Sequence, residues 1–375
     1  MSGKMITPDD GFNRVHTYFK GSPYHPDGDR VLYTRFTALG STAEVCLISR
    51  STGEETVLGE TQFYTYHNGG KAYFCDGGRK VIYRSREDEV AVCDIESRKT
   101  LRFPGNLCPY SGVLAHHFIQ KDEDFPLETQ NKMGIYLRTI DGAQTRLLAD
   151  VDRLLDNSPY GGNIRRSEIL LRLGGEISPD QKKVILFLVS RNGTLVRDYY
   201  TCDLDGSNLE FHGPLGTHIM WHANSRDILS YAKPWHTVIG SMRKHVGSDF
   251  RKNGFLASYN TETHEAAVLS EHPIIGSCHV SPSPDGKKVT LDDFNQRSMK
   301  ILVFEYDSRR MNTVAEMEFA QTSDERGSAV LSDKPGDKEL KQFDINPHPV
   351  FSLDSKTIVF NTRTGPTIRL CEITV

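Results

Sequence analysis

Short runs of alternating apolar and polar residues fill most of the chain, and turns rich in glycine, aspartate and proline separate them. A period of two is typical of half-buried β-strands. Near the C-terminus, for example, Val350-Phe351 and residues 356–361 predict two strands joined by a tight turn at 353–355. Helical periodicity is nearly absent, and the pattern predicts a short helix only in the arginine-rich segment that begins at Arg165. The chain is therefore expected to be all-β.

Related strand-turn-strand units recur along the sequence. They begin at Tyr24 (YHPDGDRVLYTRF), Glu176 (EISPDQKKVILFLVSR), His279 (HVSPSPDGKKVTLDDF) and Asn346 (NPHPVFSLDSKTIVFNT). Counting the less regular copies, seven units follow one another at intervals of roughly 50 residues, which is typical of propeller blades. We predict one seven-bladed β-propeller domain over residues 1–375, with four-stranded antiparallel blades and a site at the axial channel. A strand from the first twenty residues should share a blade with the C-terminal strand.

Composition narrows the classes of partner. The net charge is −4 and charges of both signs are interspersed, so no basic stripe for nucleic acid and no polybasic membrane anchor is expected. The N-terminus lacks the apolar run of a signal peptide, which predicts a cytoplasmic protein. The seven cysteines show no metal-type spacing and are interpreted as reduced core residues. Three polar insertions, at 121–132, 235–252 and 320–341, are expected to cover a site or to form a homodimer contact.

Imidazoles recur just before the repeated turns, where the innermost strand of each blade would begin. Propellers place function around the axial channel at these positions, so a repeated register predicts a cluster there. For any single histidine, capping a turn is an equally good explanation. The residues at this register are His16, His25, His67, Glu176, His218, His222, His279, Asn346 and His348.

The last repeat, together with HVSPSPDG and THIMW, resembles the oligogalacturonate lyases, propeller enzymes related to TolB-like propellers. In that family the last blade opens with Gln, two residues and His-Pro-His-Pro. This chain keeps the Pro-His-Pro from Pro347 to Pro349, has Asn346 in place of the first histidine, and has Phe343 where the glutamine would fall, with Gln342 adjacent. His279 and the pair His218/Trp221 also match the family pattern, and His16 lies in a similar N-terminal segment.

The resemblance implies metal-assisted β-elimination of a small acidic oligosaccharide built from uronic acid units. The metal candidates are His279, His348, Asn346 and Gln342, with Asp344 as an alternative to Gln342. Mn²⁺ suits imidazole with oxygen ligands, whereas an amide at 346 would favour Ca²⁺ or leave the site without a metal. His218 is the candidate base and Arg197 a candidate partner of the uronate carboxylate or leaving oxygen. Candidate substrate-binding residues are His16, Trp221 and Arg165.

Two other classes of function stay open. A hydrolase or lyase acting on a different uronide is one, and a hydrolase would need two flanking carboxyl groups. Glu176, Asp292 and Asp293 are the available acids at suitable registers. The other is a non-catalytic propeller that serves as an interaction platform, which would need neither a metal nor a cluster of titratable groups in the channel.

Overall fold

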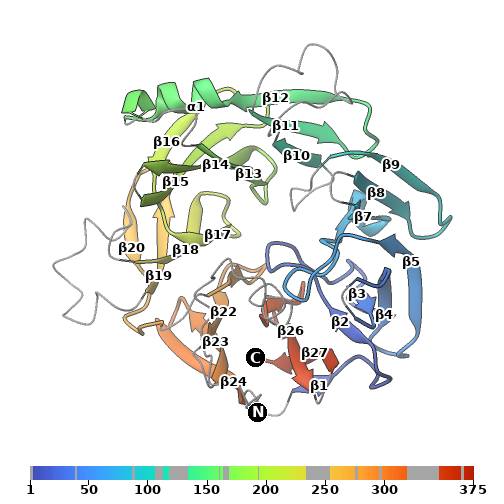
Figure 1. Cartoon of the computed structure of the whole chain (residues 1–375). Coiled ribbons are helices and arrows are strands. Elements are labelled where there is room, and N and C mark those ends of the chain that lie inside the picture. The colour runs from blue at the N-terminus through green and yellow to red at the C-terminus, as the bar shows by residue number, and fades with distance from the viewer. Residues whose placement is uncertain are drawn as a thin grey trace.

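The computed structural model shows β-sheets arranged in a ring around a central axis (Figure 1). It describes residues 3–375 except 39, 87–88, 106–112, 118–133, 160, 164–168, 193, 234–253, 275–277, 295–297, 319–345 and 365–366. Consecutive strands pair antiparallel within each sheet. Because a lone sheet cannot bury both faces, radial packing against two neighbours supplies the cover for each.

Six sheets have the expected four strands, and in five of them the chain runs outward strand by strand. The first two are β2 (Asn13–Val15), β3 (Arg30–Phe36), β4 (Ala43–Ser49), β5 (Glu55–Thr61), and β6 (Tyr73–Cys75), β7 (Lys80–Arg86), β8 (Glu89–Asp94), β9 (Thr100–Pro104). The next three are β13 (Ile169–Ile177), β14 (Lys183–Asn192), β15 (Thr194–Asp203), β16 (Glu210–Gly213); β17 (Thr217–Trp221), β18 (Asp227–Ala232), β19 (Phe255–Asn260), β20 (Ala266–Val268); and β21 (Val280–Pro282), β22 (Lys288–Phe294), β23 (Ser298–Glu305), β24 (Arg310–Glu318).

The sixth four-stranded sheet closes the ring. It contains β25 (Val350–Phe351), β26 (Thr357–Thr364), β27 (Thr367–Thr374) and, at its outer edge, β1 (Lys4–Met5). Lys4 pairs with Glu372 and Met5 with Cys371. The expectation that the two ends of the chain share a blade is confirmed, and so is the strand-turn-strand reading of the last repeat.

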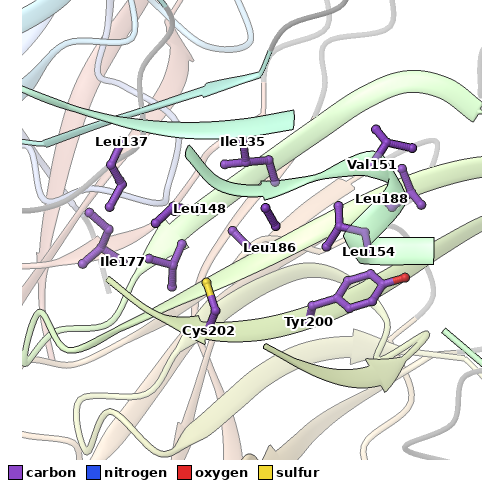
Figure 2. Packing of buried hydrophobic residues seen from close by; sticks show 12 residues of the cluster. Ile135, Leu137, Leu148, Val151, Leu154, Ile177, Leu186, Leu188, Tyr200 and Cys202 are labelled. Atoms are coloured by element: carbon purple, nitrogen blue, oxygen red, sulfur yellow. The ribbon is translucent and has the colours of Figure 1, made fainter. Parts of the chain in front are cut away.

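The expectation of seven four-stranded blades was wrong, because the described residues form six. Between the sheets of β9 and β13 lies a sheet of three described strands, β10 (Val113–His117), β11 (Gly134–Thr139) and β12 (Thr145–Asp150). After β12 the chain turns into α1 (Val151–Asn157) instead of a fourth strand. The Asp150 side chain caps this helix by accepting from the Arg153 amide at 2.8 Å. Val151 and Leu154 pack into the cluster of Figure 2, between β11 and β14.

The helix predicted from Arg165 onward was also misplaced. Residues from Ile169 to Ile177 form β13, the innermost strand of its sheet. The alternation of leucine and arginine in this segment fits a strand as well as a helix, and pairing with β14 decides the outcome. Two 3₁₀ turns, η1 (Asp76–Gly78) and η2 (Gly161–Asn163), complete the described elements.

The recurring Ser-x-Asp turns have one structural cause. In three sheets a serine hydroxyl donates to the aspartate two residues on: Ser178 to Asp180 at 2.7 Å, and Ser283 to Asp285 and Ser352 to Asp354 at 2.6 Å each. Each serine oxygen also accepts the backbone amide five residues on, at 2.9 to 3.0 Å. Together with the backbone bond from each serine amide to the carbonyl of that fifth residue, these bonds fix where each second strand begins.

Two further expectations can be compared with the fold. The six cysteines among the described residues are buried and free, as expected of reduced core thiols. None of the helices in the part of the chain that the structure describes is both long and apolar enough to cross a membrane.

Candidate metal centre and surrounding site

Three histidines from three places in the ring converge on one point. His67 lies between β5 and β6, His279 directly precedes β21, and His348 lies two residues before β25. One ring nitrogen of each lies within 4.8 Å of those of the other two. The ring centroids are 4.2 Å apart for His279 and His348, and 4.6 Å apart for His67 and His348. This spacing is compatible with three ligands of one ion.

A buried carboxylate orients His279. Its Nδ1 lies 2.9 Å from Asp292 Oδ2, and its backbone amide donates to Asp292 Oδ1 at 2.6 Å. The Asp292 carboxylate also accepts the backbone amide of His348 at 3.3 Å. Because Nδ1–H donates to the carboxylate, the available lone pair of the ring lies on Nε2, a buried atom with no hydrogen-bond partner among the described residues. Asp292 thereby positions two candidate ligands at once.

His348 is fully buried and adopts a left-handed backbone conformation with φ of 48°. Non-glycine residues seldom adopt this conformation. The positive φ turns the imidazole away from the direction that a continuous strand would give it. Among the described residues, neither ring nitrogen of His348 has a hydrogen-bond partner. Burial holds the pKa of His348 well below its usual range, and the neighbouring imidazoles lower it further. The ring is therefore neutral and can donate electrons to a cation.

His67 is placed by a tight glycine turn. Thr65 and Gly69 exchange backbone hydrogen bonds around it, and Gly69 has a φ of +53°. A Cβ at Gly69 would lie 3.0 Å from the Val15 carbonyl oxygen, so the close approach of this turn to β2 requires glycine. Burial, and to a smaller extent the neighbouring His279, lowers the pKa of His67 to about 4. This ring is also neutral.

Asn346 contacts His67 Nδ1 through its side-chain amide, and its Oδ1 is buried without a partner. If the amide donates, the proton of His67 must lie on Nε2. With the amide turned by 180°, Oδ1 accepts from Nδ1–H, the unpartnered oxygen is satisfied, and Nε2 can bind a metal. Asn346 therefore suits an orienting role behind His67 better than the role of a ligand.

The donor set fits a divalent cation. Three neutral imidazoles face one another with ring nitrogens that lack partners on His279 and His348. Burial raises the pKa of Asp292 to about 7, and a cation held beside it would favour the ionised carboxylate. Imidazole nitrogens suit first-row transition ions rather than Mg²⁺ or Ca²⁺. A cation at this point would give the buried ring nitrogens of His279 and His348 the partner that they lack among the described residues.

Histidine and aromatic side chains form the walls of the site. His218, the second residue of β17, has a φ of 52°, and its ring centroid lies 4.4 Å from that of His279. Tyr18 packs against His348 at 4.9 Å and Phe19 against His279 at 5.0 Å. The next residue, Lys20, forms an ion pair with buried Glu176. The segment after β2 thus brings two rings and one cation to the imidazole cluster.

His16 is buried beside the cluster, and burial lowers its pKa to about 4. Its backbone amide donates to Asn361 Oδ1 at 3.0 Å. Asn361 also donates from Nδ2 to the Asn346 carbonyl oxygen at 3.3 Å. Its backbone amide donates to the Pro347 carbonyl oxygen at 2.8 Å. One asparagine on β26 therefore joins the segment of His16 to the segment of His348.

Of the remaining predicted site residues, Trp221 lies in the core, and the side chains of the others are outside the described part. Trp221 is 1% exposed, and its indole donates to the Glu176 carbonyl oxygen at 3.2 Å, so it packs in the core between β-sheets and has no face open to a sugar. Arg197 on β15 pairs with Val189 on β14, and the Arg197 side chain is outside the described part. Arg165, Gln342, Phe343 and Asp344 are also outside the described residues, as are the three insertions.

No protein-family model matches the chain, and no curated protein matches it by sequence. Solved structures do resemble it. An oligogalacturonate lyase in complex with manganese has a TM-score of 0.65 at 16% identity and covers 99% of this chain and 92% of its own. An oligogalacturonate lyase from Vibrio parahaemolyticus has a TM-score of 0.64 at 13% identity, with coverage of 99% and 93%. The Cps50 (Swd1) β-propeller domain of Myceliophteria thermophila has a TM-score of 0.53 at 11% identity and covers both chains fully. At these identities the likeness shows the propeller fold.

Replacing His67 by alanine is expected to weaken Mn²⁺ binding at least about tenfold, because one of the three candidate imidazole ligands is lost. Adding Asn346→His to that variant should restore most of the affinity, since a histidine at 346 would return an imidazole to the same cluster. Titration followed by the electron paramagnetic resonance of free Mn²⁺ measures both. Wild-type affinity in His67→Ala would remove His67 from the ligand set.

Proposed function

We propose that the protein is a metal-assisted lyase that cleaves uronate-containing oligosaccharides, similar to oligogalacturonates, by β-elimination. The observation that carries the proposal is the convergence of His67, His279 and His348, with His218 beside them. The likeness in fold to a lyase solved with manganese supports it. Mn²⁺ is the proposed cofactor, because the described donors are imidazoles.

The proposed reaction removes the C5 proton of a uronate and breaks the C4–O4 bond, leaving a double bond between C4 and C5. When bound, the divalent cation would neutralise the uronate carboxylate and so make the C5 proton more acidic. His67, His279 and His348 would hold that cation. Asp292 would keep the His279 ring in the tautomer that presents Nε2.

His218 is the proposed base. Its imidazole lies next to His279 on a different strand, so it can approach a sugar held at the cluster from the side of β17. After taking the C5 proton it would carry a positive charge close to the Asp292 carboxylate, which favours that charge. The departing O4 must gain a proton, and Arg197 remains a proposed partner of that oxygen or of the carboxylate.

The carboxyl groups give less support to a hydrolase. Asp292 is committed to His279 and to the His348 amide, and Glu176 pairs with Lys20. A hydrolase needs two carboxyl groups with independent access to the scissile bond. We therefore place elimination ahead of hydrolysis.

The deciding test is to incubate the protein with a panel of uronate oligosaccharides, with and without Mn²⁺ after treatment with a chelator. We expect a Mn²⁺-dependent rise in the ultraviolet absorbance of a C4–C5 unsaturated uronate. Release of saturated sugar without that absorbance would identify a hydrolase. Substrate binding without any cleavage would instead indicate an interaction platform.

A further inference from the structure

A second group of metal-binding side chains lies far from the axial site, at the rim of the ring. Glu210 and His212 belong to β16, and His264 lies in the turn between β19 and β20. One donor atom of each lies within 4.8 Å of the others. β16 and β20 are the last strands of neighbouring sheets and lie on the outside of the ring in Figure 1. The group therefore spans a boundary between two blades.

His212 is held ready in a defined orientation. It is 5% exposed, its Nε2 lies 2.7 Å from Thr201 Oγ1, and its Nδ1 lies 3.1 Å from the Tyr259 hydroxyl. Burial lowers its pKa to about 4, so the ring is neutral at ordinary pH. When Nε2–H donates to Thr201, the lone pair lies on Nδ1 and faces the other members of the group. Protein histidines that bind metals are commonly fixed by such a bond on their second nitrogen.

The other two members can be reached by an ion from solvent. The side chains of His264 and Glu210 are 51% and 45% exposed, and His264 Nε2 lies 3.2 Å from Glu210 Oε1. His264 Nδ1 lies 2.9 Å from the Tyr259 hydroxyl. That hydroxyl therefore touches both imidazoles and is a further oxygen donor in the same place. About 3 Å is also the separation between adjacent ligands around a tetrahedral ion with bonds near 2 Å.

We propose that Glu210, His212 and His264 form a zinc site that joins the two neighbouring blades at the rim. Two imidazoles and one carboxylate are a donor set that Zn²⁺ takes in proteins, and the Tyr259 oxygen or a water molecule can complete a tetrahedron. One nitrogen of the exposed His264 ring turns toward the ion, and Glu210 exchanges its contact with that ring for a bond to the metal. The site is independent of the axial imidazoles and of the lyase proposal.

A bound ion would act as a clamp. β16 and the β19–β20 turn belong to separate sheets, so zinc bound across them stabilises the folded form over any form in which the two blades separate. Buried His212 supplies the fixed ligand, and the exposed side chains of Glu210 and His264 supply the ligands that can move. Zinc should therefore raise the temperature of unfolding without changing turnover.

The test uses full-length His279→Ala, which removes a ligand from the axial site, and measures Zn²⁺ binding by calorimetry. We expect one equivalent to bind. Adding His264→Ala should weaken that binding at least about tenfold and remove the zinc-induced rise in unfolding temperature. The matched control adds His272→Ala, which changes an exposed histidine outside both clusters and should leave binding unchanged.

A second variant protects the conclusion from loss of fold. Glu210→Gln keeps the size of the side chain and removes its charge, so it should weaken zinc binding while circular dichroism stays unchanged. Equal zinc affinity in the proteins with and without His264 would overturn the proposal, as would the absence of any zinc binding in His279→Ala. Lyase activity of His264→Ala is expected to equal that of the wild type, which separates this test from that of the axial site.

Discussion

His279→Ala is expected to release the axial cation and to lower uronate cleavage by roughly 10³-fold, while the propeller stays folded. The magnitude follows from the several kcal/mol that a metal ion contributes by stabilising developing charge. His279 is the candidate ligand whose Nε2 is oriented by a carboxylate on the opposite side of the ring, so its loss removes a donor and leaves Asp292 buried without its imidazole. Metal content after dialysis and the rate of formation of unsaturated product measure the two effects.

The control for this variant is His272→Ala, because it removes an imidazole from the surface and leaves the axial cluster intact. His348→Ala should cause the same loss of metal and activity, because it removes a candidate ligand that precedes a different strand, β25. Full activity in a protein shown to lack metal would overturn the metal-assisted mechanism. If His279→Ala unfolds, His348→Ala still tests the mechanism, because it removes a candidate ligand of the same ion and leaves Asp292 and His279 paired.

His218→Ala is expected to keep the metal and to lower kcat by about 10²- to 10⁴-fold, the range in which a positioned general base contributes. His218 contacts His279 from β17 and is outside the group of three whose ring nitrogens converge. A loss confined to kcat, with unchanged Mn²⁺ affinity, is the result expected of a base. Equilibrium dialysis with Mn²⁺ and steady-state kinetics on the same preparation separate the two quantities.

Either of two results would reassign His218. Loss of Mn²⁺ together with activity would make it a ligand, and the cluster would then contain four imidazoles. Unchanged kcat would direct attention to another proton acceptor, and Arg197→Ala would be the next variant to measure. His218→Gln adds a useful comparison, because it retains a hydrogen-bonding side chain but has no nitrogen that can accept the proton at neutral pH.

Most of the fold was predicted from the repeated turns, because the contacts that define each turn lie within one hairpin. Ser283 and Asp285 satisfy each other within one hairpin, so the same chemistry is visible in the sequence wherever that hairpin occurs. The register of histidines was visible for the same reason, since His279 and His348 each precede such a unit. Where the local pattern weakens, as at α1, the sequence did not predict the helix that the structure has.

The part of the site that sequence reasoning missed depends on contacts distant in the chain. His67 was noticed at the start of a repeat but not as a ligand, because its role arises only when the turn before β6 meets His348 across the ring. Trp221 was a substrate-binding candidate because the His218/Trp221 pair matches the family pattern, yet its indole packs in the core. Pairing with the Glu176 carbonyl, which fixes that orientation, involves a residue from the preceding sheet.

The hydrogen bonds of Asn361 bear on when the site forms during folding. They tie the segment that carries His16 to the one that carries His348, and His16 and Asn361 are 345 residues apart in the sequence. The same region closes the ring through β1 and β27. Contacts this distant form late in folding, because the loop between them must be closed first. The three-histidine centre can therefore assemble only in a completed ring, so uptake of Mn²⁺ during refolding should report the final step of folding and not the formation of individual blades.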